Sequence, residues 1–110
     1  MDILFRNTRQ KEVFSSEKLL KTEYGQLAKI ITKRMDQLRA AKSISEYMAF
    51  KIGNPHFLSG SFDKCIGINL TGNFRLIIEP LYDDNMDFSN LNLSSLEVVT
   101  IMEVKDYHGR

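Results

Sequence analysis

Apolar residues in the first half of the chain recur with helical spacing. From position 22 onward they fall three or four residues apart, at Tyr24, Leu27, Ile31, Met35 and Leu38. The charged residues of this stretch fall mostly off the stripe, at Lys29, Lys33, Arg34, Asp36 and Arg39. This pattern predicts an amphipathic helix of about 20 residues with one apolar stripe.

Shorter elements flank this helix. The apolar run at residues 2–5 favours a first or edge strand. Asn7 or Thr8 can cap a short helix over residues 9–14, and residues 15–25 continue as a helix or a broken second one. Ser43 and Glu46 form a capping box that predicts a helix ending near Lys51. The "GNP" at 53–55 then breaks the helical pattern.

Beyond residue 55 the apolar period changes from helical to two. Residues 56–60 are a short candidate strand, 64–70 and 73–79 are two alternating strands, and 96–107 is a long final strand. The "TGN" at 71–73 predicts a hairpin turn in which Gly72 takes a positive φ. Residues 82–95 are polar and acidic, which is typical of a loop.

The order strand, helices, then three or four antiparallel strands predicts an α+β fold with helices on one sheet face. The apolar stripe of the helix requires a partner, and the alternating strands supply it with Ile66, Ile68, Leu70, Phe74, Leu76 and Ile78. The opposite face carries Arg75 and is left open for function. We expect one domain over residues 1–110.

Composition narrows the classes of protein. The chain is 43% hydrophobic and 26% charged, which is ordinary for a soluble globular protein. Its one cysteine, Cys65, excludes an internal disulfide and a zinc site built from several thiolates. No signal peptide and no membrane span is evident. We therefore expect a cytoplasmic protein that does not enter a membrane.

Charge is unevenly distributed along the chain. Residues 1–55 hold 11 Lys and Arg against 6 Asp and Glu, a net charge of +5, while residues 56–110 hold 4 against 8, a net charge of −4. A basic first half can meet a polyanion such as RNA. On charge alone, a solvated helix face is the favoured interpretation.

Several residues carry side chains suited to phosphodiester cleavage. The candidates are His56, Arg75, Asp106, Tyr107 and His108, with Lys64, Lys105 and Arg110 as supporting cations. One imidazole can take the proton of a ribose 2′-hydroxyl, and another group can protonate the departing 5′-oxygen. A guanidinium can offset the charge of the phosphorane.

Each candidate also has a purely structural interpretation. A lone histidine is most often an ordinary surface residue. Arg75 can pair with Glu79 or Glu103, and Tyr107 can be a half-buried core aromatic. Cys65 is better explained as a small buried hydrophobe than as a nucleophile.

A metal site is the less favoured use of the terminal histidine. Asp106 and His108 are two positions apart on the final strand, and no second carboxylate cluster joins them. We therefore expect no metal and no other cofactor.

Three stretches together resemble the HigB-type toxins of the RelE/ParE superfamily. They are "RMDQLRAAKSISEY", "PHFLSGSFDKCIGINLTGNFRLIIEP" and the terminal "EVKDYH". The most specific parts are the His-x-Leu-x-Gly at His56–Gly60, the strand that begins Phe74-Arg75, and the final Asp-Tyr-His. The resemblance covers nearly the whole chain.

The resemblance implies a RelE-like antiparallel sheet with a mixed edge, and ribosome-dependent endonucleolytic cleavage of mRNA without a metal. It implies a helix-turn-helix antitoxin, HigA-like, which neutralises the toxin and carries the binding to operator DNA. The functional positions that it implies are His56, Asp106, Tyr107 and His108, with Arg75 as the phosphate-binding arginine.

The chain departs from the family pattern in two places. Ser59 stands where the family often has a lysine, so a phosphate-binding cation must come from elsewhere, for example Lys64. The acidic 82–95 segment is longer than the usual connection.

The basic first half gains a meaning from the resemblance. Its cations, which include Lys33 and Arg34, can contact ribosomal RNA or dock the antitoxin. The alternatives to the nuclease are a ParE-like inhibitor of DNA gyrase without nuclease chemistry, and an inactive module that only binds its antitoxin.

Overall fold

The computed structural model describes residues 1–83 and 86–107. The strands of this part are β1 (Asp2–Phe5), β2 (His56–Phe57), β3 (Ile66–Asn69), β4 (Phe74–Pro80) and β5 (Val98–Asp106). The helices are α1 (Thr8–Phe14), α2 (Glu17–Tyr24), α3 (Leu27–Ala40) and α4 (Ile44–Phe50). Three single 3-10 turns are η1 (Gly60–Phe62), η2 (Phe88–Asn90) and η3 (Leu93–Ser95).

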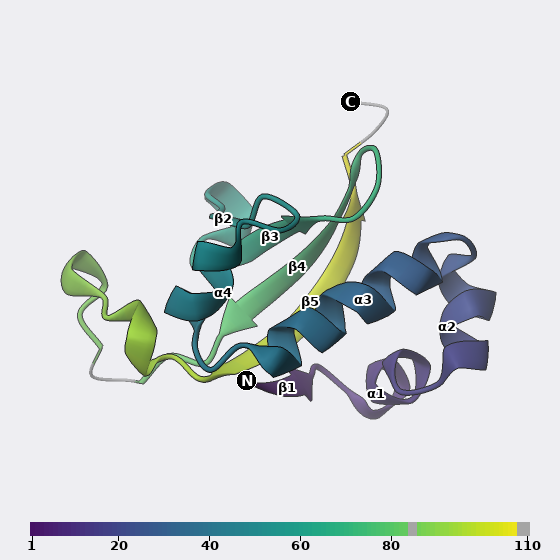
Figure 1. The fold of residues 1–110 in the computed structure, drawn as a ribbon, viewed down its shortest axis with the longest axis horizontal. Coiled ribbons are helices and arrows are strands. Elements are labelled where there is room, and N and C mark those ends of the chain that lie inside the picture. The colour runs from purple at the N-terminus through teal and green to yellow at the C-terminus, as the bar shows by residue number, and fades with distance from the viewer. Residues whose placement is uncertain (84–85, 108–110) are drawn as a thin grey trace.

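The strands form one sheet in the order β1-β5-β4-β3-β2. β1 runs parallel to β5, and the other neighbours are antiparallel. Figure 1 shows α3 lying across one face of the sheet, with α1 and α2 at one end of the molecule and the segment after β4 at the other. The predicted α+β class, with helices on one face and a mixed edge, is confirmed.

The core lies between the helices and the sheet. The apolar stripe of α3 is buried at Ile31, Met35 and Leu38, and it packs in one cluster with the alternating residues of β3 and β4. The predicted sheet residues of this cluster are all buried or partly buried: Ile66, Ile68, Leu70, Phe74, Leu76 and Ile78. Burial of this apolar area is the main force that holds α3 on the sheet.

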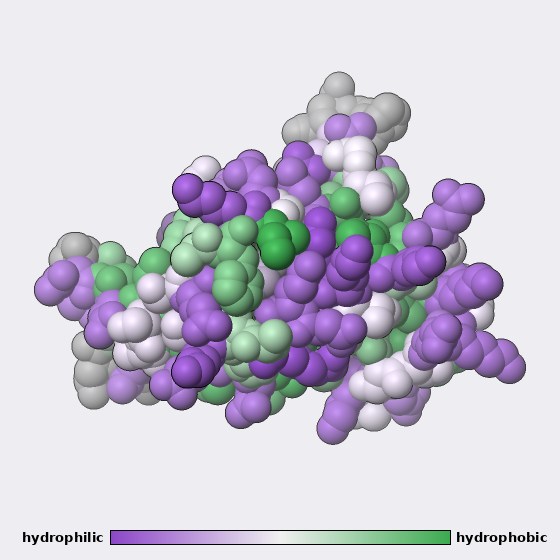
Figure 2. Space-filling view, viewed as in Figure 1, coloured by the Kyte–Doolittle hydropathy of each residue, from purple (hydrophilic) through white to green (hydrophobic). Residues whose placement is uncertain are grey.

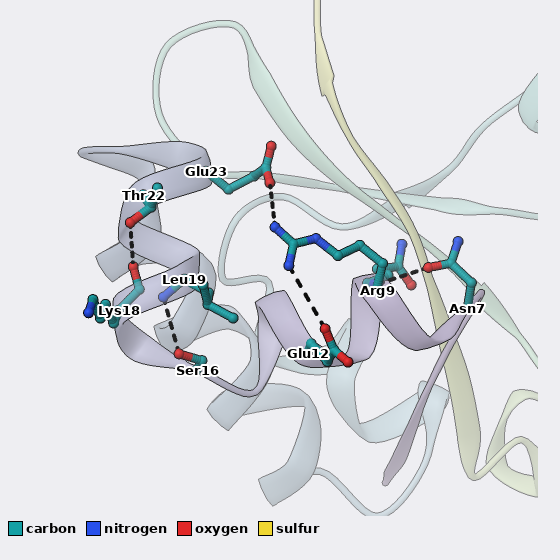
Figure 3. A network of polar contacts seen from close by, with 9 residues as sticks. Asn7, Arg9, Glu12, Ser16, Lys18, Leu19, Thr22 and Glu23 are labelled. Carbon is teal, nitrogen blue, oxygen red and sulfur yellow. Dashed lines mark hydrogen bonds and ion pairs between the residues drawn. The ribbon is translucent and has the colours of Figure 1, made fainter.

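Side-chain caps fix the start of the first two helices (Figure 3). Asn7 Oδ1 accepts a bond of 2.8 Å from the backbone N–H of Gln10, and Ser16 Oγ accepts one of 3.1 Å from that of Leu19. Each cap satisfies an amide that has no partner within its helix. Arg9 bridges the two helices, with Glu12 at 3.8 Å and Glu23 at 4.0 Å, although such exposed pairs add little stability.

The prediction of one long helix from position 22 is wrong about where that helix begins. Gly25 has a φ of 56°, which ends α2, and its N–H bonds to the carbonyl of Lys21 at 2.8 Å. Glycine adopts a positive φ readily because it has no Cβ to clash, so it commonly ends a helix. Tyr24 therefore belongs to α2, and the α3 stripe begins at Leu27.

Two later segments also differ from the prediction. The candidate strand over 56–60 pairs only at His56 and Phe57, and the chain then turns into η1. The 82–95 segment is not simply a polar loop, because it contains η2 and η3 and packs Leu91 and Leu93 against the core. In the part of the chain that the structure describes, no helix has the length and apolar character needed to cross a bilayer.

Candidate functional site

The sheet face turned away from the helices carries the candidate residues of β4 and β5. The register places Arg75 between Asn69 on β3 and Lys105 on β5. Side chains alternate between the faces of a sheet, and the neighbours Phe74 and Leu76 pack on the helix side. Arg75 and Lys105 therefore share the open face.

These two cations face each other directly across the strands, and both are partly exposed. Like charges in this arrangement repel. Within the described part of the chain, neither Glu79 nor Glu103 forms an ion pair with Arg75, so the structural pairing considered from the sequence is not observed. An anion placed between Arg75 and Lys105 would relieve the repulsion, which makes this point a candidate phosphate site.

The guanidinium of Arg75 is held in place by its surroundings. Its Nη1 donates to the carbonyls of Gly72 and Phe74, each at 3.3 Å, and its Cζ lies 5.4 Å from the ring centroid of Tyr107. The N–H of Tyr107 bonds in turn to the carbonyl of Asn73 at 3.0 Å. A guanidinium has five N–H donors, so this anchoring leaves donors for a phosphate.

His56 lies on β2, at the sheet edge, in register with Gly67 and through it with Ile77. It is therefore on the same face as Arg75, two strands away and two positions along. That corresponds to about 12 Å between the two Cα atoms.

The imidazole of His56 is oriented by a backbone carbonyl. Its Nδ1 lies 2.9 Å from the carbonyl oxygen of Asn54, which can only accept a hydrogen bond. The neutral ring must then carry its proton on Nδ1, which leaves the lone pair on Nε2. His56 is exposed, and Nε2 has the form that a general base requires.

Other predicted residues are not brought to this point. Asp106 pairs with Phe74, so the register puts it on the helix side of the sheet, where it is exposed at the strand end. Lys33 is exposed on α3, on the other side of the sheet from Arg75. Lys64 lies beside the segment after β4, with its Nζ 4.1 Å from the ring centroid of Phe88. His108 and Arg110 lie outside the described residues.

Arg34, predicted to contact RNA, is instead used inside the protein. It is only 9% exposed, and its Nε donates to the carbonyl of Asn69 at 3.0 Å. The chain passes close by at Gly53, where a Cβ would lie 2.9 Å from Nε of Arg34. This buried guanidinium ties α3 to the end of β3. It also lowers the pKa of Tyr47, although burial outweighs this and raises that pKa to about 12.

Cys65 is buried, as the sequence predicts for a small hydrophobe. Burial raises the pKa of its thiol to about 11, and the nearby carboxylate of Glu79 adds to the effect. The Sγ lies 3.9 Å from Oε2 of Glu79. A thiol in this state is a poor nucleophile near neutral pH.

These raised pKa values predict a loss of stability in alkali. Burial also raises the pKa of Tyr82 to about 12. In the unfolded chain these groups ionise near their ordinary pKa values, which is at a lower pH than in the folded chain. The stabilisation is therefore complete below about pH 9 and declines as pH rises through about 11 to 12.

Urea unfolding between about pH 8 and about pH 11 should show this decline. The Cys65→Ala and Tyr82→Phe variants should show a shallower one, whereas equal slopes in all three proteins would contradict the assignment.

No protein-family model matches this chain, and no curated protein matches it. A solved structure described as a YoeB/ParE toxin from Agrobacterium tumefaciens is similar, with a TM-score of 0.56 and 11% sequence identity. The match covers 98% of this chain and 100% of the other. The similarity shows that the two chains share a fold, the toxin fold of the RelE/ParE type.

Proposed function

We propose that this protein is the toxin of a type II toxin–antitoxin system, of the HigB type, and that it cleaves mRNA on the ribosome in the cytoplasm. The observation that carries the proposal is the open sheet face. There Arg75 and Lys105 oppose each other, Tyr107 lies against Arg75, and His56 shares the same face. The shared fold supports the toxin assignment.

In this proposal, His56 is the general base. Its Nε2 removes the proton from a ribose 2′-hydroxyl, and the 2′-oxygen attacks the adjacent phosphorus. The bond from phosphorus to the 5′-oxygen breaks, which leaves a 2′,3′-cyclic phosphate and a free 5′-hydroxyl end. The carbonyl of Asn54 keeps the ring oriented while the charge on the imidazole changes.

The two cations of the open face stabilise the phosphorane. Arg75 is the stronger contributor, because its planar guanidinium can bond two phosphate oxygens and is already anchored. His108 is our candidate for the acid that protonates the 5′-oxygen, and Tyr107 positions Arg75. The reaction as proposed uses no metal or cofactor.

The helical side of the molecule has a separate role. Figure 2 shows hydrophilic side chains over most of α3 and the neighbouring helices. Lys29, Lys33 and Arg39 are exposed there. We assign these three cations of α3 to ribosomal RNA. Neutralisation is assigned to a HigA-like helix-turn-helix antitoxin, through which alone the complex binds operator DNA.

The test compares three assays of the wild-type protein. The proposal expects mRNA cleavage in a translating extract, much slower cleavage of the same RNA without ribosomes, and unaffected DNA gyrase. Equal cleavage of naked RNA would contradict ribosome dependence. Inhibited gyrase with intact mRNA would instead support the ParE-like alternative, and no effect on either would support the inactive antitoxin-binding module.

A further inference from the structure

The segment after β4 borders an open cavity of about 400 Å³ at the end of the sheet that carries β2. Two of its lining residues belong to η2 and η3, which lie at the opposite end of the molecule from α1 and α2 (Figure 1). Its volume falls within the range of roughly 300–1,000 Å³ that is common for small-molecule sites. The residues that matter here are Phe57, Leu58, Asp63, Lys64, Tyr82 and Phe88.

Two of the lining residues are phenylalanines with large exposed areas. Phe57 is 40% exposed and Phe88 is 45% exposed. The ring of Tyr82 stands nearly edge-on to that of Phe88, with centroids 4.9 Å apart. The hydroxyl of Tyr82 donates to the carbonyl of Lys64 at 2.7 Å, which fixes this aromatic corner. Exposed rings at the wall of a pocket offer flat faces on which a planar ligand can stack.

Charged groups stand at the same cavity. The Nζ of Lys64 lies 4.1 Å from the ring centroid of Phe88, and Asp63 also lines the cavity. An ammonium on a flexible stem can leave the ring for a phosphate oxygen. A carboxylate can accept a bond from the N–H groups of a base. Aromatic faces combined with a cation are the features that bind single-stranded nucleic acid.

The cavity adjoins the candidate catalytic face. Phe57 follows His56 on β2, so alternation turns its side chain to the other face of the sheet, whereas Leu58 lies over Gly67, the residue that pairs with His56. Leu58 also lines the cavity, so it is the residue through which the cavity meets the face that carries His56. A Cβ at Gly67 would lie 3.1 Å from Cδ2 of Leu58, so Gly67 leaves the space that Leu58 fills. A strand of RNA bound at His56 can therefore place a neighbouring base in the cavity.

We propose that this cavity is a subsite for one nucleobase of single-stranded RNA, next to the cleaved phosphodiester. The base stacks on Phe88 or Phe57, and Lys64 binds its phosphate. The inference rests on the proposed function for the identity of the ligand. It also gives the long 82–95 segment, the departure from the family pattern, a role in choosing where the RNA is cut.

The test uses a short 2′-O-methyl RNA that contains one 2-aminopurine, bound to the purified full chain. This probe cannot be cleaved, because it lacks the 2′-hydroxyl nucleophile, so its binding is independent of the chemistry. Stacking on an aromatic ring should quench its fluorescence. The Phe88→Ala and Phe57→Ala variants should bind it about 10-fold to 100-fold more weakly. Phe88→Trp should retain the quench, and Lys64→Gln should weaken binding and reduce its salt dependence.

Phe50→Ala is the matched control, because Phe50 on α4 is also 40% exposed but does not line the cavity. It should leave the quench unchanged. Equal quenching in Phe88→Ala and wild type, or no quenching by the wild type, overturns the inference. Weakened antitoxin binding by Phe88→Ala with an unaffected probe also overturns it, in favour of a protein-docking site. A quench that needs Phe88, in a protein that cleaves no mRNA, refutes the nuclease and leaves the base site standing.

Discussion

Replacing Arg75 with alanine should lower the rate of mRNA cleavage in a translating extract by about 100-fold to 1,000-fold. Arg75 is the anchored member of the cation pair, and its partner Lys105 cannot replace a guanidinium that bonds two oxygens. Removing one well-placed donor to a charged transition state typically costs this much. Arg75→Lys should recover only a small part of the rate.

Replacing His56 tests the same site through the base. His56→Ala should lower cleavage by about 100-fold to 10,000-fold. Lys18→Ala is the matched control for Arg75, because Lys18 is an exposed cation on α2 and far from the open face. It should cleave at the wild-type rate. Cleavage by Arg75→Ala within about threefold of wild type would falsify the assignment, provided that its thermal unfolding is unchanged.

Replacing Gly53 with alanine should lower the free energy of unfolding by about 3 kcal/mol. Gly53 has a φ of 75°, a conformation in which a Cβ is strained. A Cβ there would also lie 2.8 Å from Ile68, 2.9 Å from Arg34 and 3.0 Å from the carbonyl of Asn69. These neighbours cannot easily move, because Ile68 is fully buried and Arg34 is bonded to Asn69.

Gly60 offers a matched control for this substitution. Its φ of 71° is nearly the same, but a Cβ there would meet nothing within 4 Å. Gly60→Ala should therefore cost only the backbone strain, about 1 kcal/mol. Urea unfolding of both variants measures the difference. Equal losses would show that the close approach to Arg34 contributes nothing.

The sequence predicted the elements whose signals are local. The capping residues Asn7 and Ser43 accept the expected backbone bonds, and Gly72 takes its positive φ in the hairpin. Alternation along β3 and β4 also identified the core face correctly. These features depend on residues close together in the chain, so a pattern of neighbours is sufficient to predict them.

The sequence-based predictions that were wrong involve contacts between distant residues or a rare backbone conformation. The stripe from Tyr24 to Leu27 keeps helical spacing across Gly25, so spacing alone did not reveal the break. In the sequence, Arg34 is one more cation on a basic helix. It is buried only because Asn69 and Gly53, which are distant in the chain, pack beside it.

In the candidate site, too, some features follow from neighbouring residues and others depend on contacts between distant residues. Strand alternation can predict that Arg75 faces away from the core. The register that sets Lys105 beside it, and Asp106 on the other face, depends on how β5 docks on β4. The pairing of these strands includes a shift of register between Ile77 and Ile78, which no local pattern in the sequence marks. The aromatic cavity also depends on a fold contact, because Phe57 and Phe88 are far apart in the chain.

The parallel pairing of β1 with β5 has a consequence for the order in which the fold can form during synthesis. Asp2 pairs with Val98, so β1 can pair with β5 only after nearly the whole chain has been translated. The same late strand contributes Lys105 and holds the residue before Tyr107. A nascent chain emerging from a ribosome therefore lacks both the completed sheet and the phosphate site. Under the proposed nuclease function, the phosphate site is complete only after synthesis has passed residue 107.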